Sequence, residues 1–453
     1  MSKLLAKYNV PVPRYTSYPP ANFFSKEFTA TDYEIALKKS NKNKPSHLSF
    51  YLHIPFCHHL CHYCGCNSFA MGTRNTIERY VAALHKEIDI VIQNLNPERK
   101  IAQIHYGGGT PTVLPSSVLK ELNAHLLSAF PQIENPEIAI ECHAAYLNES
   151  DLQVLADTGF NRFSIGIQDF NEKVLKAVNR RPTKLPVKIV FDILRTAGAK
   201  INLDLLYGLP LQTVESFSQT VRHAVELQPN RLVTFSYAHV PWVNPRQLIL
   251  EKIGLPSAYD KNRIYDTARE ILLQSGYKAI GLDHFVKPDD ELYFALQNRQ
   301  LHRNFQGYCT RRTTGQVYAF GVTAISQLAT VYAQNDKNIE DYISHIDGGL
   351  ATIKGYTLSE EEQIVREVIE TLMCNYCIDW YELSDRLEMT VETIKNSTSF
   401  DAARFREFAN DGIIKMSDSR IEITTDGRLF VRNIAAAFDK WQQNTDRKFS
   451  KPV

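Results

Sequence analysis

The chain has 453 residues, which is enough for two or three domains or for one large barrel with an accessory domain. Hydrophobic residues make up 44% of the sequence and charged residues 22%, the composition of a globular protein with a sizeable core. The 51 basic and 50 acidic side chains give a formal net charge of +1. This balance excludes a bulk electrostatic attraction to nucleic acid or to an anionic membrane surface.

Residues 1–20 contain no apolar segment of the kind that a secretory signal requires. No apolar run in the sequence approaches the ~18 residues of a membrane-spanning helix. We therefore expect a cytoplasmic protein without a membrane partner. In a reducing compartment, closely spaced cysteines serve more often as metal ligands or catalytic thiols than as disulfides.

Short β-rich runs alternate with amphipathic helical segments from residue 49 onward. Apolar residues recur three and four positions apart in 76–95 and 117–130, a periodicity that predicts helices. Strands that alternate with helices indicate parallel βαβ units, which could form an open sheet or most of a (β/α) barrel. The predicted strands are 49–56, 101–109, 137–143, 161–170, 200–208 and 230–240.

The sequence changes character beyond about residue 350. Residues 358–374 have helical periodicity, and 411–438 predict a β-hairpin, with its turn at 417–419, followed by a helix. A winged helix is one interpretation, and in isolation it would suggest DNA binding. Residues 358–453, however, carry 13 Lys and Arg against 18 Asp and Glu, a net charge of −5. Because this is the wrong sign for phosphate contacts, we prefer an accessory or lid domain.

Four of the eight cysteines lie within the segment CHHLCHYCGC at 57–66. A dense cysteine run that leaves a strand is typical of an iron–sulfur cluster, because thiolates on one tight loop can reach several irons. Cys57, Cys61 and Cys64 would each hold one iron. The fourth iron would stay open to a ligand if Cys66 points elsewhere.

A structural zinc loop is the alternative interpretation of these thiols. Zinc sites usually combine two cysteine pairs, and no second pair lies near the first. Cys374 and Cys377 form a distant C-x-x-C, which we interpret as core or incidental thiols.

Three consecutive glycines end the second predicted strand, in HYGGGTPT at 105–112. Glycine lets the backbone approach a ligand closely and offers N–H groups to an anionic or polar group. The cysteines, the glycines, Glu141 and the Gln168–Asp169 pair all fall at carboxyl ends of predicted strands. Barrels and open parallel sheets place their active sites at that end, so we expect one shared site.

The cysteine spacing and the GGG strand end resemble those of the radical S-adenosylmethionine (SAM) enzymes. More narrowly, the chain is similar to the oxygen-independent coproporphyrinogen III oxidases, and the similarity runs almost end to end. The matching segments, in chain order, are KYNVPVPRYTSYP, FYLHIPFCHHLCHYCGCN, HYGGGTPT, NRFSIGIQDFN, NLDLLYGLP, SYAHVP, GLDHFVKPDDEL, LHRNFQGY and TTDGRLFVRNI.

The resemblance implies an α/β fold, a partial (β/α)6 radical SAM barrel with a mostly helical C-terminal accessory domain. We accordingly expect an N-terminal segment at 1–47 that packs over the active site, a catalytic domain at 48–357 and a mostly helical domain at 358–453. The resemblance also implies a [4Fe–4S] cluster and two SAM molecules per chain. The implied reaction is oxidative decarboxylation of two propionates of coproporphyrinogen III to vinyls, which yields protoporphyrinogen IX in anaerobic haem biosynthesis.

The resemblance assigns roles residue by residue. Cys57, Cys61 and Cys64 match the cluster ligands, while Cys66 matches a cysteine needed for activity without binding iron. Tyr51 matches a tyrosine beside cluster and cofactor, and we count it with Cys66 as catalytic. The other matches are to SAM contacts: Gly108, Gly109, Glu141, Leu206 and Ala238 at the first SAM, and Gln168, Arg180 and Asp204 at the second.

The resemblance further implies a tetrapyrrole substrate, an electron donor, and an electron acceptor that the sequence does not identify. It implies no nucleic-acid partner, and we expect a monomer. A substrate with four carboxylates needs basic side chains, for which Arg14, His302 and Arg303 are candidates.

The chain departs from the family pattern after Glu141. The common Val-Asp-Pro-Arg is replaced by Cys-His-Ala-Ala at 142–145, and Tyr106 replaces a tryptophan before the glycines. The changed loop leaves open a haem-degrading radical SAM methyltransferase or another diverged enzyme. A haem chaperone that binds cluster and SAM is the other alternative, although such relatives generally lack the fourth cysteine and the PRYTSYP segment present here.

Overall fold

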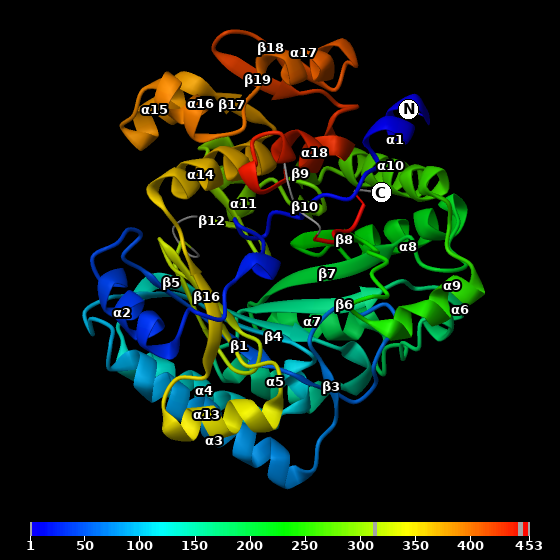
Figure 1. Cartoon of the computed structure of the whole chain (residues 1–453). Coiled ribbons are helices and arrows are strands. Elements are labelled where there is room, and N and C mark those ends of the chain that lie inside the picture. Colours follow the sequence, from blue (N-terminus) through cyan, green and yellow to red (C-terminus); the bar gives the residue numbers. More distant parts are fainter. Residues whose placement is uncertain (1, 311–314, 443–446, 452–453) are drawn as a thin grey trace.

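The computed structural model describes residues 2–310, 315–442 and 447–451. Its centre is a row of parallel strands, each hydrogen-bonded to the next and connected through helices (Figure 1). The strands in this row are β1 (Leu48–Ile54), β4 (Ile101–Gly108), β5 (Gln132–Cys142), β6 (Arg162–Gln168), β7 (Lys200–Tyr207) and β8 (Arg231–Ser236). All of the strands predicted from the sequence are thus confirmed, with ends shifted by a few residues.

Helices cover the outer face of these strands (Figure 1). They are α3 (Arg74–Ile92), α4 (Ser116–Ala129), α5 (Glu149–Asp157), α6 (Glu172–Ala177), α7 (Val187–Thr196), α8 (Val214–Glu226), α9 (Leu248–Ile253) and α10 (Ala258–Gln274). Outward residues of β1 such as Phe50 and Leu52 are fully buried beneath them. The inward-facing residues of the same strands are largely polar, because side chains alternate between the two faces of a strand. This alternation gives the barrel a polar interior that can hold a site.

The sheet extends beyond the predicted strands at both edges. β13 (Val317–Phe320) pairs parallel with β1 and is followed by antiparallel β14 (Ile325–Gln327), β15 (Val331–Asn335) and β16 (Thr352–Thr357). At the other edge, β10 (His284–Val286) pairs antiparallel with β8, and β9 (Lys278–Ile280) pairs antiparallel with β10. A separate hairpin of β11 (Leu301–Asn304) and β12 (Gly307–Thr310) follows α11 (Glu291–Gln297). None of these elements was predicted.

The C-terminal part forms its own layer above the strands (Figure 1). Its helices are α14 (Glu360–Asn375), α15 (Trp380–Leu387), α16 (Val391–Ser397), α17 (Ala402–Asn410) and α18 (Val431–Ala436). The predicted hairpin is confirmed as β18 (Ile414–Met416) and β19 (Arg420–Ile423), and β17 (Cys377–Asp379) adds a third strand. This part is mostly helical, as expected.

The N-terminal segment shares its hydrophobic core with this C-terminal layer. Tyr8, Tyr15 and Tyr18 are buried against residues of α14, α17 and α18. Further along, α2 (Ala30–Ser40) packs through Tyr33 and Leu37 into the core of the barrel. The segment therefore joins the two layers, with α1 (Ser2–Tyr8) on the C-terminal one.

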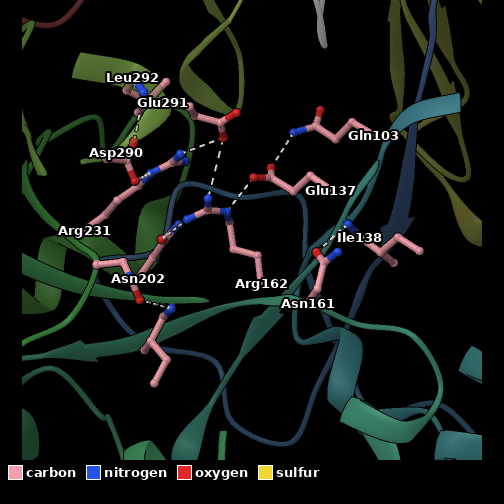
Figure 2. A network of polar contacts seen from close by, with 12 residues as sticks. Gln103, Glu137, Ile138, Asn161, Arg162, Asn202, Arg231, Asp290, Glu291 and Leu292 are labelled. Carbon is pink, nitrogen blue, oxygen red and sulfur yellow. Dashed lines mark hydrogen bonds and ion pairs between the residues drawn. The ribbon is translucent and has the colours of Figure 1, made fainter. Parts of the chain in front are cut away.

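A network of buried ions closes the amino ends of the parallel strands (Figure 2). Arg162 Nε donates to Glu137 Oε2 at 2.5 Å, and Arg231 Nε donates to Asp290 Oδ2 at 2.8 Å. Glu291 Oε1 accepts from Arg231 Nη2 at 2.9 Å. Burial alone would raise the pKa of Glu137, but Arg162 and Arg231 outweigh it and hold the pKa well below its usual range. The network ties α11 to the barrel at the end opposite the cysteine loop.

Candidate active site at the carboxyl ends of the strands

The four clustered cysteines lie on the loop between β2 (Phe56–Cys57) and β3 (Phe69–Ala70), directly after β1. All four are free thiols; Cys57 and Cys61 are buried, whereas Cys66 reaches solvent. Distant side chains hold the loop through its backbone carbonyls. Asn179 Nδ2 donates to Leu60 O at 3.0 Å, and Gln247 Nε2 donates to Tyr63 O at 3.0 Å. The loop is therefore fixed by the segments that follow β6 and β8.

Each predicted cluster ligand receives a hydrogen bond from a different donor. Thr110 Oγ1 donates to Cys57 Sγ at 3.5 Å, and Arg180 Nη1 donates to Cys61 Sγ at 3.7 Å. The Cys66 thiol donates to Cys64, which lowers the pKa of Cys64 to about 6 and raises the pKa of Cys66 well above its usual range. Such donors stabilise the thiolate that binds a metal.

Cys66 differs from the other three thiols in this arrangement. It is a donor where Cys57, Cys61 and Cys64 are acceptors, and it keeps solvent contact. Three thiols that accept hydrogen bonds and one that donates, on a single loop, fit a cluster with one iron left open. Among residues 2–310, 315–442 and 447–451, no three His, Cys, Asp or Glu side chains converge on one point that would hold a single metal ion. Thiolates that bind separate irons of a cluster need not converge in this way.

The glycine run packs against the cysteine loop and the inner face of the strands. A Cβ on Gly108, whose φ is +111°, would lie 2.6 Å from the His53 ring. A Cβ on Gly109 would lie 2.7 Å from the carbonyl carbon of Pro55. Gly109 N–H donates to Ile54 O at 2.8 Å, so the expectation of a free N–H is wrong for this residue. Glycine is required here for close approach of protein backbone as well as for any ligand.

Tyr51 stands at the centre of an aromatic and polar group on the inward face. Its hydroxyl lies 3.1 Å from His53 Nδ1, and its ring stacks on His105 and meets the edge of Phe305. Burial lowers the pKa of His53, so the ring is neutral. With Nε2 3.0 Å from the carbonyl of Asn67, His53 donates through Nε2 and accepts the Tyr51 hydroxyl proton at Nδ1.

Glu141 is the exposed carboxylate of this side of the site. Its Oε1 lies 3.1 Å from His105 Nε2, while 42% of its side chain remains accessible. A carboxylate with free lone pairs can accept from an ammonium or hydroxyl group of a ligand. His53, His105 and Phe305 were not predicted from the sequence. The alternation of β1 and β4 could have identified the two histidines, since they share a face with Tyr51.

The residues predicted for the second SAM lie on β6, β7 and the segment between them. Gln168 ends β6 at a register irregularity with φ +74°, a left-handed conformation that is uncommon for non-glycine residues. Asp204 Oδ2 accepts from Ser164 Oγ at 2.8 Å, and burial raises the pKa of Asp204 to about 6. A Cβ on Gly166 would lie 2.8 Å from Gln168 Nε2 and 3.0 Å from Arg180 Nη2. Gln168 and Arg180 therefore lie side by side.

Arg180, which was predicted to contact the second SAM, also reaches the cysteine loop. Nη1 donates to Tyr63 Oη at 2.8 Å as well as to Cys61, and Nη2 donates to the carbonyl of Gly166. The side chain therefore bridges the cysteine loop and β6. Arginine can do this because its planar fork presents several donors in fixed directions.

The remaining predicted contacts line the same end of the barrel. Leu206 is buried beside Tyr63, and its carbonyl accepts from Gln212 Nε2 at 2.9 Å. Ala238 follows β8 and is partly exposed. The changed loop after Glu141 adds His143 to this end, where it lines a cavity of about 140 Å³ together with Arg180. Burial lowers the pKa of His143 to about 3, which keeps the imidazole neutral.

Comparisons with known proteins agree with this arrangement. The model of the radical SAM superfamily matches residues 51–224. The oxygen-independent coproporphyrinogen III oxidase of Synechocystis sp. is 38% identical over 457 residues, covering 100% of this chain and 98% of the relative. The protein of that name from Escherichia coli K12 is 37% identical, covering 99% and 98%. The chain belongs to the oxygen-independent coproporphyrinogen III oxidases.

A solved structure supports this membership. It is described as the coproporphyrinogen III oxidase (HemN) from Escherichia coli, a radical SAM enzyme. It matches with a TM-score of 0.87 and 36% identity, over 94% of this chain and 97% of that one. The expected fold class, a partial radical SAM barrel with a helical C-terminal part, is confirmed. Membership in the radical SAM enzymes implies a [4Fe–4S] cluster and SAM, and the thiols and carboxylates described above fit both. Within the described residues, no helix is long and apolar enough to cross a membrane.

Proposed function

We propose that this chain converts two propionate side chains of coproporphyrinogen III to vinyl groups by oxidative decarboxylation, without oxygen. The observation that carries the proposal is the cysteine loop, where three thiols accept hydrogen bonds and Cys66 donates one. When bound, the cluster and SAM supply the abstraction of a hydrogen atom from the propionate β-carbon, which acid–base groups cannot achieve. Loss of CO₂ and one electron from that propionate then leaves the vinyl group.

The chain's own residues bind and orient the reactants. Cys57, Cys61 and Cys64 would hold the cluster, and the hydrogen bond from Thr110 partly offsets the rise that burial causes in the pKa of Cys57. Glu141 would accept from one SAM, next to Tyr51 and the glycine turn with Gly108 and Gly109.

Leu206 and Ala238 border the same SAM in this proposal. Cys66 stays protonated and solvent-facing, which suits contact with substrate rather than iron. Tyr51, whose hydroxyl donates to His53, also borders the site.

A second SAM per chain is the finer part of the proposal. Asp204 and Gln168 lie on β7 and β6, whereas Glu141 lies on β5, and they could bind the second SAM. Arg180 reaches toward both regions, so it would link the second SAM to the cysteine loop.

The proposal also covers the expectations that follow from the family. An electron donor must reduce the cluster, and an acceptor must take the electron released with CO₂. We further propose a monomeric, cytoplasmic enzyme divided at residues 47 and 357.

Anaerobic incubation of reconstituted protein with coproporphyrinogen III, SAM and a one-electron reductant tests the function. We expect protoporphyrinogen IX, released CO₂ and a partially decarboxylated intermediate, with SAM consumed. The Cys66→Ser variant, assayed at equal iron content, is the matched control and should form no decarboxylated porphyrin and release no CO₂. Consumption of SAM without decarboxylated porphyrin, or with a methylated or ring-opened tetrapyrrole, would favour the haem-degrading alternative.

A further inference from the structure

Lys261, on α10, lies across the carboxyl ends of β7 and β8. A Cβ on Gly208, which follows β7, would lie 2.7 Å from Lys261 Cε, and Lys261 Nζ donates to the carbonyl of Tyr237 at 2.8 Å. The ammonium group therefore sits at the mouth of the barrel. Burial, together with the positive charges of Arg14 and Arg432, lowers the pKa of Lys261 to about 7. No carboxylate within the described residues forms an ion pair with it.

Arg14 and Arg303 lie next to Lys261 and to each other. Arg303 Nη1 donates to the carbonyls of Arg14 and Tyr15, and its Nε is buried without a partner in the described chain. The guanidinium of Arg14 makes no hydrogen bond or ion pair in the described residues. Its side chain reaches solvent although burial lowers its pKa, with Arg303 as a second cause.

Arg432, on α18, completes the group from the C-terminal layer. It donates to the backbone carbonyls of Val12, Pro13, Ser450 and Lys451 and to the Ser450 hydroxyl, all of them uncharged acceptors. Burial lowers the pKa of Arg432 to about 9, and the charges of Arg14 and Arg303 add to the effect.

The four cations face one acidic group within the described residues. Asp283 interacts with Arg303 and Arg14, but it also hydrogen-bonds His284 Nδ1 at 2.7 Å. Buried charges are stable when they are paired, and like charges at close range repel each other. The excess of positive charge therefore calls for anionic groups that the protein itself does not supply.

Lys261 lies at the carboxyl ends of β7 and β8, whereas the cysteine loop follows β1. Asp204 lies on β7 between the two regions. A ligand that reacts near the cysteine loop and extends across the mouth would thus place its far end among the cations.

We propose that Arg14, Lys261, Arg303 and Arg432, hereafter the basic cluster, bind the propionate carboxylates of the tetrapyrrole that are not reacting. The inference rests on the proposed function and specifies how its substrate is oriented. Arginine pairs with carboxylates through parallel N–H donors, and Lys261 adds a point charge. Rotation of the macrocycle would then bring each reacting propionate in turn to the cysteine loop while other carboxylates occupy the basic cluster.

Two of the basic candidates from the sequence belong to the cluster, and one does not. Arg303 Nη1 donates to the carbonyl of Arg14, so these two candidates lie next to each other. His302 instead pairs through Nδ1 with Glu370, on the opposite face of the same strand. Lys261 and Arg432 were not predicted, because they come from separate segments whose proximity only the fold reveals.

Equilibrium binding of coproporphyrin III to the reconstituted holoprotein, without reductant, tests the inference. This oxidised tetracarboxylate cannot react, and its fluorescence reports binding. The variants are Arg14→Gln and Lys261→Met, and Arg263→Gln is the matched control, since Arg263 is exposed on α10. We expect each variant to bind about tenfold to a hundredfold more weakly than wild type, the loss of one charge-assisted contact. Arg263→Gln should bind nearly as wild type does, and Arg14→Lys, which keeps the charge but loses the paired N–H donors, should bind more tightly than Arg14→Gln and more weakly than wild type.

Binding of the tetramethyl ester of coproporphyrin III distinguishes a failure of the basic cluster from a failure of the proposed function. Wild type should prefer the free acid, and the variants should lose this preference while binding the ester equally. If wild type prefers the acid but both variants retain its affinity, the basic cluster is not the carboxylate site and the proposed function stands. If wild type binds neither porphyrin, the proposed function itself is contradicted. Unchanged iron content and SAM affinity in each variant show that the fold is intact.

Discussion

Gly107 and Glu141 lie so close together that a Cβ on the glycine would stand 2.6 Å from the carboxylate Oε1. The same Cβ would be 3.0 Å from a ring carbon of Tyr51. Because β4 carries no side chain here, the Glu141 carboxylate stays beside His105, and Tyr51 keeps its place above the cysteine loop. The first glycine of the run thus positions the carboxylate predicted to bind SAM.

Gly107→Ala should therefore displace Glu141 and weaken SAM binding. We expect about a tenfold loss of affinity, equivalent to one charge-assisted hydrogen bond, at unchanged iron content. Isothermal titration with SAM under anaerobic conditions measures it. Gly348→Ala is the control, because a Cβ there meets no atom within 4 Å. Equal affinities of the two variants would show that Glu141 does not need the space beside Gly107.

The thiol hydrogen bonds distinguish Cys66 from the cluster ligands. Changing Cys57, Cys61 or Cys64 to serine should abolish iron binding, since a hydroxyl is a poor cluster ligand. Cys66→Ser should retain iron, because this thiol is a donor and not an acceptor. Iron and sulfide analysis after anaerobic reconstitution gives the result. Cys377→Ser is the control, because Cys377 lies far from the cysteine loop in the sequence, and this variant should bind as much iron as wild type. If the Cys66→Ser variant lost its iron, Cys66 would be a cluster ligand, and no iron would remain open to SAM.

The ionisation of Asp204 should make SAM binding depend on pH. Burial raises the pKa of Asp204 from 3.8 to about 6, so the free protein carries this group mostly protonated at pH 5 and ionised at pH 7. A cationic or hydroxyl-donating ligand prefers the carboxylate, and affinity at this site should rise by about tenfold between those pH values.

Asp204→Asn is the matched variant for this pH dependence. It keeps the shape of the side chain and removes the titration, so its SAM affinity should be weak and flat between pH 5 and 7. Titrations at several pH values, with SAM stoichiometry determined at each, provide the comparison. If the SAM affinity of wild type did not change between pH 5 and 7, Asp204 would not be a contact of the second SAM.

Arg162→Met should destabilise the barrel without touching the site. Removing one partner of a buried ion pair costs about 3–5 kcal/mol, because the other charge stays buried. Glu137 would keep Gln103, 2.8 Å away, and Arg231, so we expect the lower end of this range. Urea denaturation measures the change. Arg74→Met breaks an ion pair whose side chains are 92% and 60% exposed and should cost less than about 0.5 kcal/mol.

The same network predicts the response to acid. The folded pKa of Glu137 is depressed below its ordinary value of 4.5, so its contribution to stability is complete above that pH. The contribution is lost as the pH falls through the lower folded value. Wild type should therefore lose stability between about pH 4.5 and 2 more steeply than Glu137→Gln. If the free energy of unfolding fell equally with pH in the two proteins, the arginines would not be lowering the pKa of Glu137.

The sequence predicted the parallel strands well because each is long, apolar on its outward face and followed by an amphipathic helix. It missed β13 to β16, which are three to six residues long and too short for a clear period. Local spacing was enough to find the cysteine loop and Glu141. Lys261 and Arg432 could not be found in this way, since they are 171 positions apart and meet only after folding.

Arg432 holds the carbonyls of residues 12 and 13 against the C-terminal layer, and this has a consequence for the timing of biosynthesis. A ribosome has made the cysteine loop and every parallel strand long before it adds α18. Until then the carbonyls of residues 12 and 13 lack their Arg432 donor, so the N-terminal segment is not yet fixed to the C-terminal layer. Iron uptake by nascent chains stalled after residue 357, compared with uptake by the completed chain, would measure whether loading precedes closure.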